Sequence, residues 1–332
     1  MKYELLDDTM RANVLTIGIP THNRVTGVTQ HAKKLIAESV HDVAEVLIID
    51  NASTDGTFES LREICDGTSI RVLRNDRNLG YRGNFLRLFE ECETEYLMVT
   101  SDEEPVIPAN LGAFVQFLKT HRPLFVSPQY YRREQPAGLF RGQMATRRIV
   151  PYEFLFCSAH MPGLAYRTQE SKEVLSDIKT HLEKDELKAY PQALLAAGLI
   201  LRGPCFWWDK PIVHQEYDFP RLHGIFNHVS QRWDQHKGFV DFFKEMVENA
   251  SDPATKRIAT QMLKAQQEGL IHRLRSAIEL ERPDLLPPFD RSARSFYKDK
   301  HPLRSMAGKY VRGVRHPAAS WRALRRKIGR YR

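Results

Sequence analysis

The sequence has few cysteines, no long apolar run and no apolar N-terminal segment. Its four cysteines, Cys65, Cys92, Cys157 and Cys205, are far apart and form no CxxC pair, so the spacing indicates neither a zinc site nor a disulfide framework. We expect reduced thiols in a cytoplasmic protein. The longest apolar stretch, residues 193–201, is shorter than the ~20 residues that a membrane-spanning helix needs. The acidic start MKYELLDDTM does not resemble a secretory signal.

Charge is distributed unevenly along the 332 residues. The chain has a net charge of +8, yet residues 291–332 hold fourteen Lys and Arg against the single acid Asp299. This segment therefore carries +13, and residues 1–290 carry −5. A mildly acidic body with a strongly basic tail indicates that the tail meets an anionic surface.

Short apolar runs alternate with helical patterns over the first third of the chain. The runs cover residues 14–19, 46–49, 70–73 and 96–99, and the helical patterns cover residues 28–40, 57–65 and 83–92. Nearly continuous apolar strands separated by helices predict a parallel sheet with helices on both faces. Farther along, residues 205–208 and 211–213 are expected to form a strand pair around residues 209–210, and residues 236–285 to be helical.

Each of the first four expected strands leads into polar residues. The four loops read PTHNR, DNASTDG, RNDRNLG and TSDEE, at residues 20–24, 50–56, 74–80 and 100–104. In an open α/β sheet, ligands bind at the carboxyl ends of the strands. One polar loop is ordinary, but four in succession favour a binding site at this edge.

These loops carry a resemblance to a known family. The sequence resembles the family 2 glycosyltransferases of the GT-A fold through IPTHNR (19–24), VLIIDNASTDGT (46–57), NDRNLG (75–80) with Asn84, and YLMVTSDEE (96–104). The resemblance implies an α/β fold of the nucleotide-diphospho-sugar transferase type, a mixed sheet flanked by helices, with a helical C-terminal extension. We expect the GT-A domain at residues 1–235, the extension at 236–290 and a basic amphipathic tail at 291–332.

The resemblance also assigns roles at the carboxyl edge. Asp102 and Glu104 stand in the place of the family's Asp-x-Asp segment and would hold Mg²⁺ or Mn²⁺, hard cations that prefer oxygen ligands. Glu103 between them is expected to point away if the segment is extended. Asp50 would hydrogen-bond the nucleotide base. The further residues expected to contact the nucleotide-sugar are Pro20, Thr21, Arg24, Asn51, Asn78, Arg82 and Ser101 together with Asp102.

Each of these residues also has a simpler interpretation. The segment 101–104 could be an acidic turn, and residues 53–57 follow ordinary turn and cap chemistry because Asp55-Gly56 is a turn signal. Arg82 could equally be an exposed arginine on a helix surface.

The catalytic base is expected in a later acidic segment. Many family members carry a Glu-Asp pair about a dozen residues before an Ala-Gly near a helix end, and here Asp185 and Glu186 precede Ala197-Gly198. Either acid would remove the proton of the acceptor hydroxyl in an inverting transfer. The alternative is a solvated acidic helix start. His160 and His214 are candidates for a third metal ligand, an acceptor contact or a structural role.

The tail contains an amphipathic pattern. Trp321, Leu324, Ile328 and Tyr331 would form one apolar stripe on a helix, with arginines beside or opposite it. Such a helix is typical of an anchor on an anionic membrane surface, and a flexible solvated tail is the alternative.

The sequence thus leads to one main hypothesis and one alternative. The main hypothesis is a peripheral enzyme on the inner face of the cell membrane, which transfers sugar from a nucleotide-sugar to a glycan or lipid-linked glycan during surface polysaccharide synthesis. The alternative is a catalytically degenerate GT-A domain that serves as a membrane-associated glycan-binding or scaffold protein. Nucleic-acid binding through the tail is not expected because the body is acidic.

Overall fold

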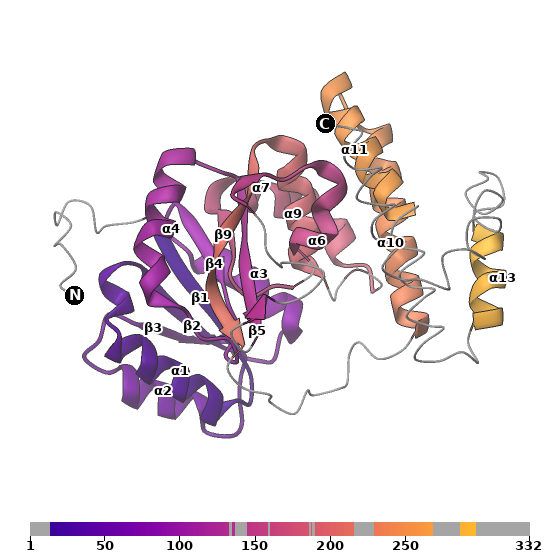
Figure 1. Ribbon diagram of the computed structural model, residues 1–332. Coiled ribbons are helices and arrows are strands. Elements are labelled where there is room, and N and C mark those ends of the chain that lie inside the picture. The colour runs from indigo at the N-terminus through magenta and orange to yellow at the C-terminus, as the bar shows by residue number, and fades with distance from the viewer. Residues whose placement is uncertain are drawn as a thin grey trace.

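The computed structural model describes residues 14–132, 135–136, 145–158, 160–185, 187, 190–215, 229–267 and 286–296. These residues form an α/β domain with helices on both faces of a sheet, followed by a group of C-terminal helices (Figure 1). Glu186 and the amphipathic stripe at 321–331 lie outside the described residues.

Within the described residues, nine strands form one mixed sheet in the order β3-β2-β1-β4-β8-β5-β9-β7, with β6 paired to β5. Strands β1, β2, β3 and β4 are parallel, as the sequence predicts, whereas β8 is antiparallel to both of its neighbours, β4 and β5. The strands are β1 (Leu15–Thr21), β2 (Glu45–Asp50), β3 (Arg71–Arg74), β4 (Tyr96–Val99), β5 (Phe125–Arg132), β6 (Gln135–Pro136), β7 (Arg147–Arg148), β8 (Leu164–Arg167) and β9 (Cys205–Gln215).

Helices cover the two faces of the sheet and bury it. One face packs against α1 (Val25–Ala37), α2 (Thr57–Cys65) and α4 (Pro108–His121), and the other against α3 (Gly80–Glu91), α6 (Phe154–Ser158), α7 (Thr168–Asp177) and α9 (Pro191–Arg202). Along β2, Val46 and Ile48 lie in the first core and Leu47 and Ile49 in the second. Both faces are apolar because both are covered, which explains the continuous apolar runs. Each buried side chain contributes roughly 1.5–3 kcal/mol. The short helices are η2 (Val40–Asp42), η3 (Pro151–Glu153) and α8 (Lys179–Leu182).

The helical extension packs directly on the domain. It contains α10 (Val229–Glu248), α11 (Pro253–Ala265) and α13 (Leu286–Phe296). The fully buried Phe242 and Phe243 of α10 join the core beside α9, and the Phe243 ring lies 4.7 Å from that of Phe154. The expected boundary at residue 235 therefore falls inside α10. None of the helices in the described part of the chain is long and apolar enough to cross a membrane.

The expected strand pair around residues 209–210 is wrong. A single strand, β9, runs through this region. Pro128 pairs with Trp208, but the next residue, Gln129, pairs with Pro211. Residues 209 and 210 are therefore accommodated as a bulge, which keeps the strand continuous.

Candidate functional site

The parallel register brings the first four polar loops to one edge of the sheet. Thr21 pairs with Asp50, Asp50 pairs with Arg74, and Gly18 pairs with Val99. The hydroxyl of Thr21 donates a hydrogen bond of 2.8 Å to Oδ2 of Asp102. The structure therefore unites Thr21, Asp50 and Asp102, which the sequence places in one site.

Asp50 is fully buried at the centre of this edge. Its Oδ2 accepts a hydrogen bond from the backbone N–H of Ser53 at 3.1 Å and lies 3.5 Å from Nε of Arg74. Within the described residues, its Oδ1 has no hydrogen-bond partner. A buried carboxylate oxygen without a donor is costly, so this atom is suited to accept a hydrogen bond from a ligand.

Arg74 was not anticipated from the sequence. Besides Asp50, its guanidinium contacts the carbonyl oxygen of Ser53 at 2.8 Å and Glu59 at 3.0 Å, and it lies over the ring of Phe58 at 5.1 Å. In the sequence, only its position at the end of the β3 run indicates that Arg74 belongs to the site. Arg74 fixes the Asp50 carboxylate and the loop that follows it.

The loop at 53–57 follows turn and cap chemistry. Asp55 accepts hydrogen bonds from the backbone N–H groups of Val25 and Thr57 and from the Thr57 hydroxyl, and thereby joins the starts of α1 and α2. Burial alone would raise the pKa of Asp55, but these hydrogen bonds outweigh it and hold the pKa below its ordinary value. Asn23 is the second link, because its backbone N–H donates to the Ser53 hydroxyl at 2.8 Å.

Asn51 and Asn78 belong to a network of amides. Oδ1 of Asn51 accepts from Asn75 at 2.8 Å and from the Leu79 N–H at 2.9 Å, and its Nδ2 donates to Oδ1 of Asn78 at 2.8 Å. Asn75 continues to Asn84 at 3.0 Å. These side chains hold the loops after β2 and β3 together. Asn51 and Asn78 are expected from the sequence as nucleotide contacts, and in the structure their side chains form hydrogen bonds within the protein.

Asp102 is half-buried and crowded by protein atoms. Burial raises its pKa to about 6, although the Thr21 hydrogen bond and Arg24 act in the opposite direction. Arg24 pairs at 2.6 Å with Glu103. Glu103 is expected to point away only if the segment is extended, and this condition is not met: the backbone bends at residues 102–104, and Glu103 pairs with Arg24 in the loop after β1.

Glu104 is turned into the protein and is only 7% exposed. Its Oε1 accepts a hydrogen bond from the Tyr130 hydroxyl at 3.2 Å and lies 3.7 Å from Nε2 of His160, while its Oε2 accepts from the Ser101 hydroxyl. Both carboxylate oxygens already have protein partners. His160 therefore lies beside Glu104, and His214 is linked to the same segment through a backbone hydrogen bond of 3.3 Å to Pro105.

The donor set fits a divalent cation held mainly by non-protein oxygens. Within the described residues, no group of three or more His, Cys, Asp or Glu side chains is placed to hold a metal ion. Asp102, however, offers a half-buried carboxylate whose pKa is raised mainly by burial, so a cation beside it would favour its ionised form. Mg²⁺ and Mn²⁺ accept one or two protein carboxylates together with waters and phosphate oxygens. Asp102 fits this role more directly than Glu104.

Arg82 lies at the start of α3, and Asp185 lies in the turn between α8 and α9. Arg82, in the first turn of α3, donates to the carbonyl oxygen of Leu182. Asp185 is exposed on the turn between the buried residues Leu182 and Leu187, and Glu186 lies outside the described residues. Next to this turn, the Tyr81 hydroxyl contacts Oε1 of Gln192 at 3.3 Å. Pro20 lies within β1 and pairs with Ile49.

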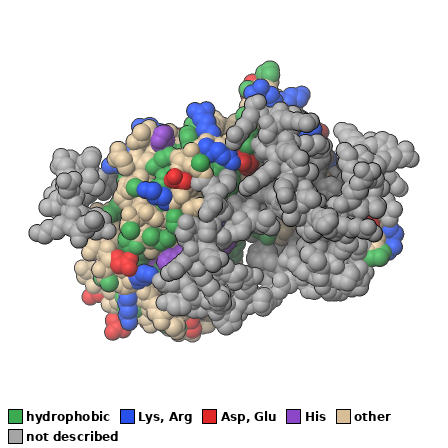
Figure 2. Space-filling view, in the orientation of Figure 1, with side chains coloured by type: hydrophobic (Ala, Val, Ile, Leu, Met, Phe, Trp, Pro, Cys, Tyr) green, Lys and Arg blue, Asp and Glu red, His purple; other side chains and the backbone are tan. Residues whose placement is uncertain are grey.

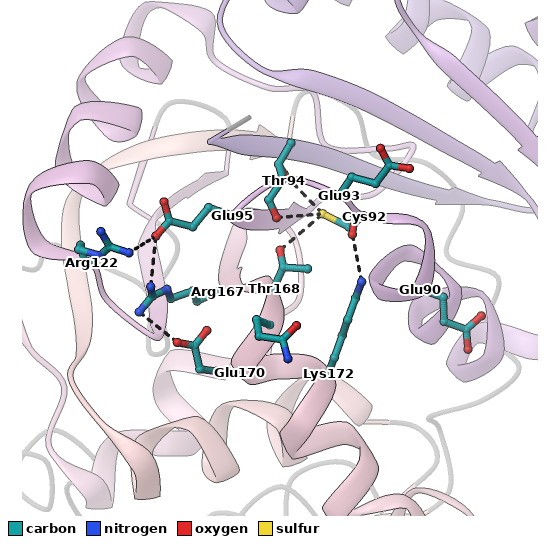
Figure 3. Close-up of a pocket in the computed structure, with 11 residues that line it drawn as sticks. Glu90, Cys92, Glu93, Thr94, Glu95, Arg122, Arg167, Thr168, Glu170 and Lys172 are labelled. Atoms are coloured by element: carbon teal, nitrogen blue, oxygen red, sulfur yellow. Dashed lines mark hydrogen bonds and ion pairs between the residues drawn. The ribbon is translucent and has the colours of Figure 1, made fainter. Parts of the chain in front are cut away.

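The opposite edge of the sheet holds a pocket of about 560 Å³ (Figure 3). Glu95, just before β4, pairs with Arg122 at 3.1 Å and with Arg167 at 3.4 Å, and Arg167 pairs with Glu170 at 3.0 Å. Acidic and basic side chains that line the pocket are therefore paired with each other. None of the expected site residues lines this pocket. We assign this network to the joining of α4, β8 and α7.

The surface over the domain carries both charges. On the face shown in Figure 2, Lys and Arg side chains are interspersed with Asp and Glu over the described part of the domain. This mixture fits the small net charge of residues 1–290.

The fold and the polar carboxyl edge define a GT-A-type α/β domain. Residues 16–169 match the model of the family described as Glycosyl transferase family 2. The resemblance expected from the sequence is thereby confirmed. Comparison with curated proteins found no match.

Solved structures with this fold include TarS 1–349 and PcManGT. The S. aureus TarS 1–349 structure gives a TM-score of 0.59 at 15% identity, covering 84% of this chain and 78% of that chain. Mannosyltransferase PcManGT from Pyrobaculum calidifontis gives a TM-score of 0.53 at 15% identity, covering 97% of this chain and 86% of that chain. The expected mixed sheet flanked by helices is confirmed.

Proposed function

We propose that this chain is an inverting glycosyltransferase that passes a sugar from a nucleoside-diphosphate sugar to a hydroxyl group of a glycan. The observation that carries the proposal is the placement of Asp50 and Asp102 around Thr21. Asp50 faces Thr21 in the strand register and presents a buried oxygen without a donor, while Asp102 accepts the Thr21 hydrogen bond. The Asp50 carboxylate is suited to accept a hydrogen bond from a base N–H or a ribose hydroxyl. The Asp102 carboxylate is suited to bind a cation beside a diphosphate.

The comparisons support the donor class. Structures of the two similar proteins are described as TarS 1–349 in complex with UDP-GlcNAc and as PcManGT in complex with GDP-Man and Mn²⁺. We extend a nucleotide-sugar donor and a Mg²⁺ or Mn²⁺ cofactor to this chain because the residues at its carboxyl edge fit both.

Each residue would then have a defined task. Asp50 would orient the nucleoside, and Arg74 would keep the Asp50 carboxylate in place. A Mg²⁺ or Mn²⁺ ion, when bound at Asp102, supplies positive charge to a departing diphosphate. Asp185 or Glu186 would take the proton of the acceptor hydroxyl. The hydroxyl oxygen would at the same time attack the anomeric carbon on the face opposite to the departing diphosphate. Holding both substrates in line supplies much of the remaining acceleration.

The test is a screen of nucleotide-sugars for Mn²⁺-dependent hydrolysis and transfer by the full chain. We expect Asp102→Asn to lower turnover on the order of 100-fold because it removes the charge next to the diphosphate. The matched control is Asp76→Asn, an exposed aspartate in the loop after β3 at the same edge. Full turnover in Asp102→Asn, or an equal loss in Asp76→Asn, would contradict the metal assignment.

One observation favours the alternative of a degenerate binding module. Both oxygens of Glu104 are already hydrogen-bonded within the protein. A chain that binds UDP or GDP in the presence of Mn²⁺ but turns over no nucleotide-sugar would support this alternative.

We further propose that the acceptor is a lipid-linked glycan in surface polysaccharide synthesis and that the basic tail holds the enzyme on the inner face of the cell membrane. This proposal rests on the +13 charge of residues 291–332 and on the stripe at 321–331. We suggest a truncation after Phe296, the last residue of α13. This helix is kept because Trp233 of α10 donates a hydrogen bond of 2.8 Å to its Ser292. The full chain should sediment with vesicles containing phosphatidylglycerol, and the truncated chain should not. Equal sedimentation would remove the anchor.

A further inference from the structure

The turn that carries Asp185 is held from two sides. It follows α8, whose carbonyl oxygen at Leu182 accepts a hydrogen bond from Arg82 of α3. On the other side, the buried imidazole of His181 lies 3.2 Å from Glu245 of α10, measured from Nε2 to Oε2. The His181 ring also packs edge-on against Phe242 with ring centroids 4.9 Å apart. The short helix before the turn is thus fixed between the sheet domain and the C-terminal extension.

The hydrogen-bonding partners define which nitrogen of His181 carries the proton. Nδ1 lies 3.2 Å from Nζ of Lys184, which can only donate, so Nδ1 accepts. Nε2, the nitrogen that carries a proton when Nδ1 accepts, lies 3.2 Å from Oε2 of Glu245 and so faces an acceptor. Since His181 is only 2% exposed, loss of Glu245 would leave a buried donor without its acceptor.

The backbone carries this restraint to Asp185. The N–H of Lys184 donates to the carbonyl oxygen of His181 at 3.2 Å, and the N–H of Leu187 donates to that of Lys184 at 3.0 Å. Leu182 and Leu187 are both buried in the core that also contains Phe242. Asp185 is exposed between these two anchors. A shift of α8 would therefore move the Asp185 backbone directly.

We propose that Glu245 and His181 are positioning residues for the catalytic base, so that α10 of the C-terminal extension is part of the catalytic apparatus. The inference rests on the proposed glycosyltransferase function. Glu245 acts through His181 on the turn and touches neither substrate. Its loss should lower kcat and leave KM for the donor unchanged, because Asp50 ends β2 and Asp102 follows β4, and neither belongs to the turn that His181 and Glu245 restrain. A displacement of the base by a fraction of an ångström costs on the order of tenfold in rate.

The experiment compares three variants of the full chain. Glu245→Ala removes the acceptor, Glu245→Gln keeps a neutral acceptor at the same reach, and Asp241→Asn is the matched control. Asp241 is an exposed acid on the same helix that pairs at 3.0 Å with Lys244. Steady-state kinetics are measured together with amide hydrogen exchange in residues 179–187.

We expect Glu245→Ala to lower kcat on the order of tenfold at constant donor KM and to accelerate exchange in residues 179–187. Glu245→Gln should recover most of the rate, and Asp241→Asn should match the unsubstituted chain in both measurements. An unchanged kcat in Glu245→Ala, or an equal loss in Asp241→Asn, overturns the inference alone. Absence of turnover in the unsubstituted chain overturns the proposed function and this inference with it.

Discussion

The hydroxyl of Thr21, the last residue of β1, donates a hydrogen bond of 2.8 Å to the carboxylate of Asp102, which follows β4. The two residues lie 81 positions apart in the sequence. The parallel pairing of β1 with β4 brings them together. This contact opposes the effect of burial on the pKa of Asp102 and so favours the ionised form that would bind a cation.

Thr21→Val should weaken binding of Mn²⁺ with a nucleoside diphosphate on the order of tenfold, because a hydrogen bond to a charged group contributes roughly 1.5–3 kcal/mol. Thr21→Ser retains the hydroxyl and should bind nearly as well as the unsubstituted chain. Calorimetric titration with UDP and GDP in the presence of Mn²⁺ measures both affinities. Equal affinity in Thr21→Val would show that the contact does not prepare Asp102 for a cation.

Asp50→Asn should lower the affinity for the nucleoside itself by tenfold or more, since the partnerless buried oxygen would no longer belong to a carboxylate. Titration with uridine, guanosine and their diphosphates checks this and identifies the preferred base. Glu59→Gln is the control, because Glu59 also pairs with Arg74 but is largely exposed. A similar loss in Glu59→Gln would assign the effect to Arg74 and its loop.

Gly198→Ala should destabilise the fold by about 1–3 kcal/mol. A Cβ atom at Gly198 would lie 2.3 Å from Cγ1 of Val174, where α9 approaches α7. Gly112→Ala in α4 is the matched control, since a Cβ there meets nothing within 4 Å. In urea denaturation, Gly112→Ala should be as stable as the unsubstituted chain. The double variant Gly198→Ala with Val174→Ala should recover part of the stability that Gly198→Ala loses. Equal stability of both single variants would contradict the close approach.

His236 should make the fold sensitive to mild acid. Burial lowers its pKa from 6.5 to about 4, and Gln266 contacts its Nδ1 at 3.3 Å. As pH falls below 6.5, His236 becomes protonated in the unfolded chain, whereas in the folded chain it stays neutral until about pH 4. The free energy of unfolding therefore declines between pH 6.5 and pH 4. The loss attributable to His236 between pH 7.5 and pH 5 should be on the order of 2 kcal/mol. The urea midpoints at the two pH values should differ less in His236→Gln than in the unsubstituted chain. The same difference in both proteins would show that His236 does not cause the loss of stability.

The sequence predicts the first half of the sheet well and the second half poorly. Strands β1 to β4 are short apolar runs that end in turn residues, and both signals are local. The bulge at residues 209–210 of β9 and the antiparallel placement of β8 between β4 and β5 depend on contacts between distant segments. Periodicity does not encode such contacts. Pro191, which could kink a helix or open one, stands at the first position of α9.

The same limit applies to the site. Asp50 and Asp102 are expected through the family resemblance, and each stands at the end of an apolar run. The enclosure of Glu104 by Tyr130 and His160 could not be predicted, because these residues come 26 and 56 positions later. Arg74 and Glu245 are also defined by partners that only the folded chain supplies. The sequence pattern therefore indicates the acids but not the side chains that contact them.

The position of β8 has an evolutionary consequence. β8 separates the parallel strands β1 to β4 from β5 and β9, and Asp50 and Asp102, with their partners Thr21, Ser53 and Arg74, come from one uninterrupted stretch of chain, residues 15–104. The turn with Asp185 and the extension that holds it come from later residues. One crossover between related genes within α4 would exchange the second part and keep the first intact. Such a protein would keep the edge proposed here for the donor and gain another segment in place of the one proposed for the acceptor.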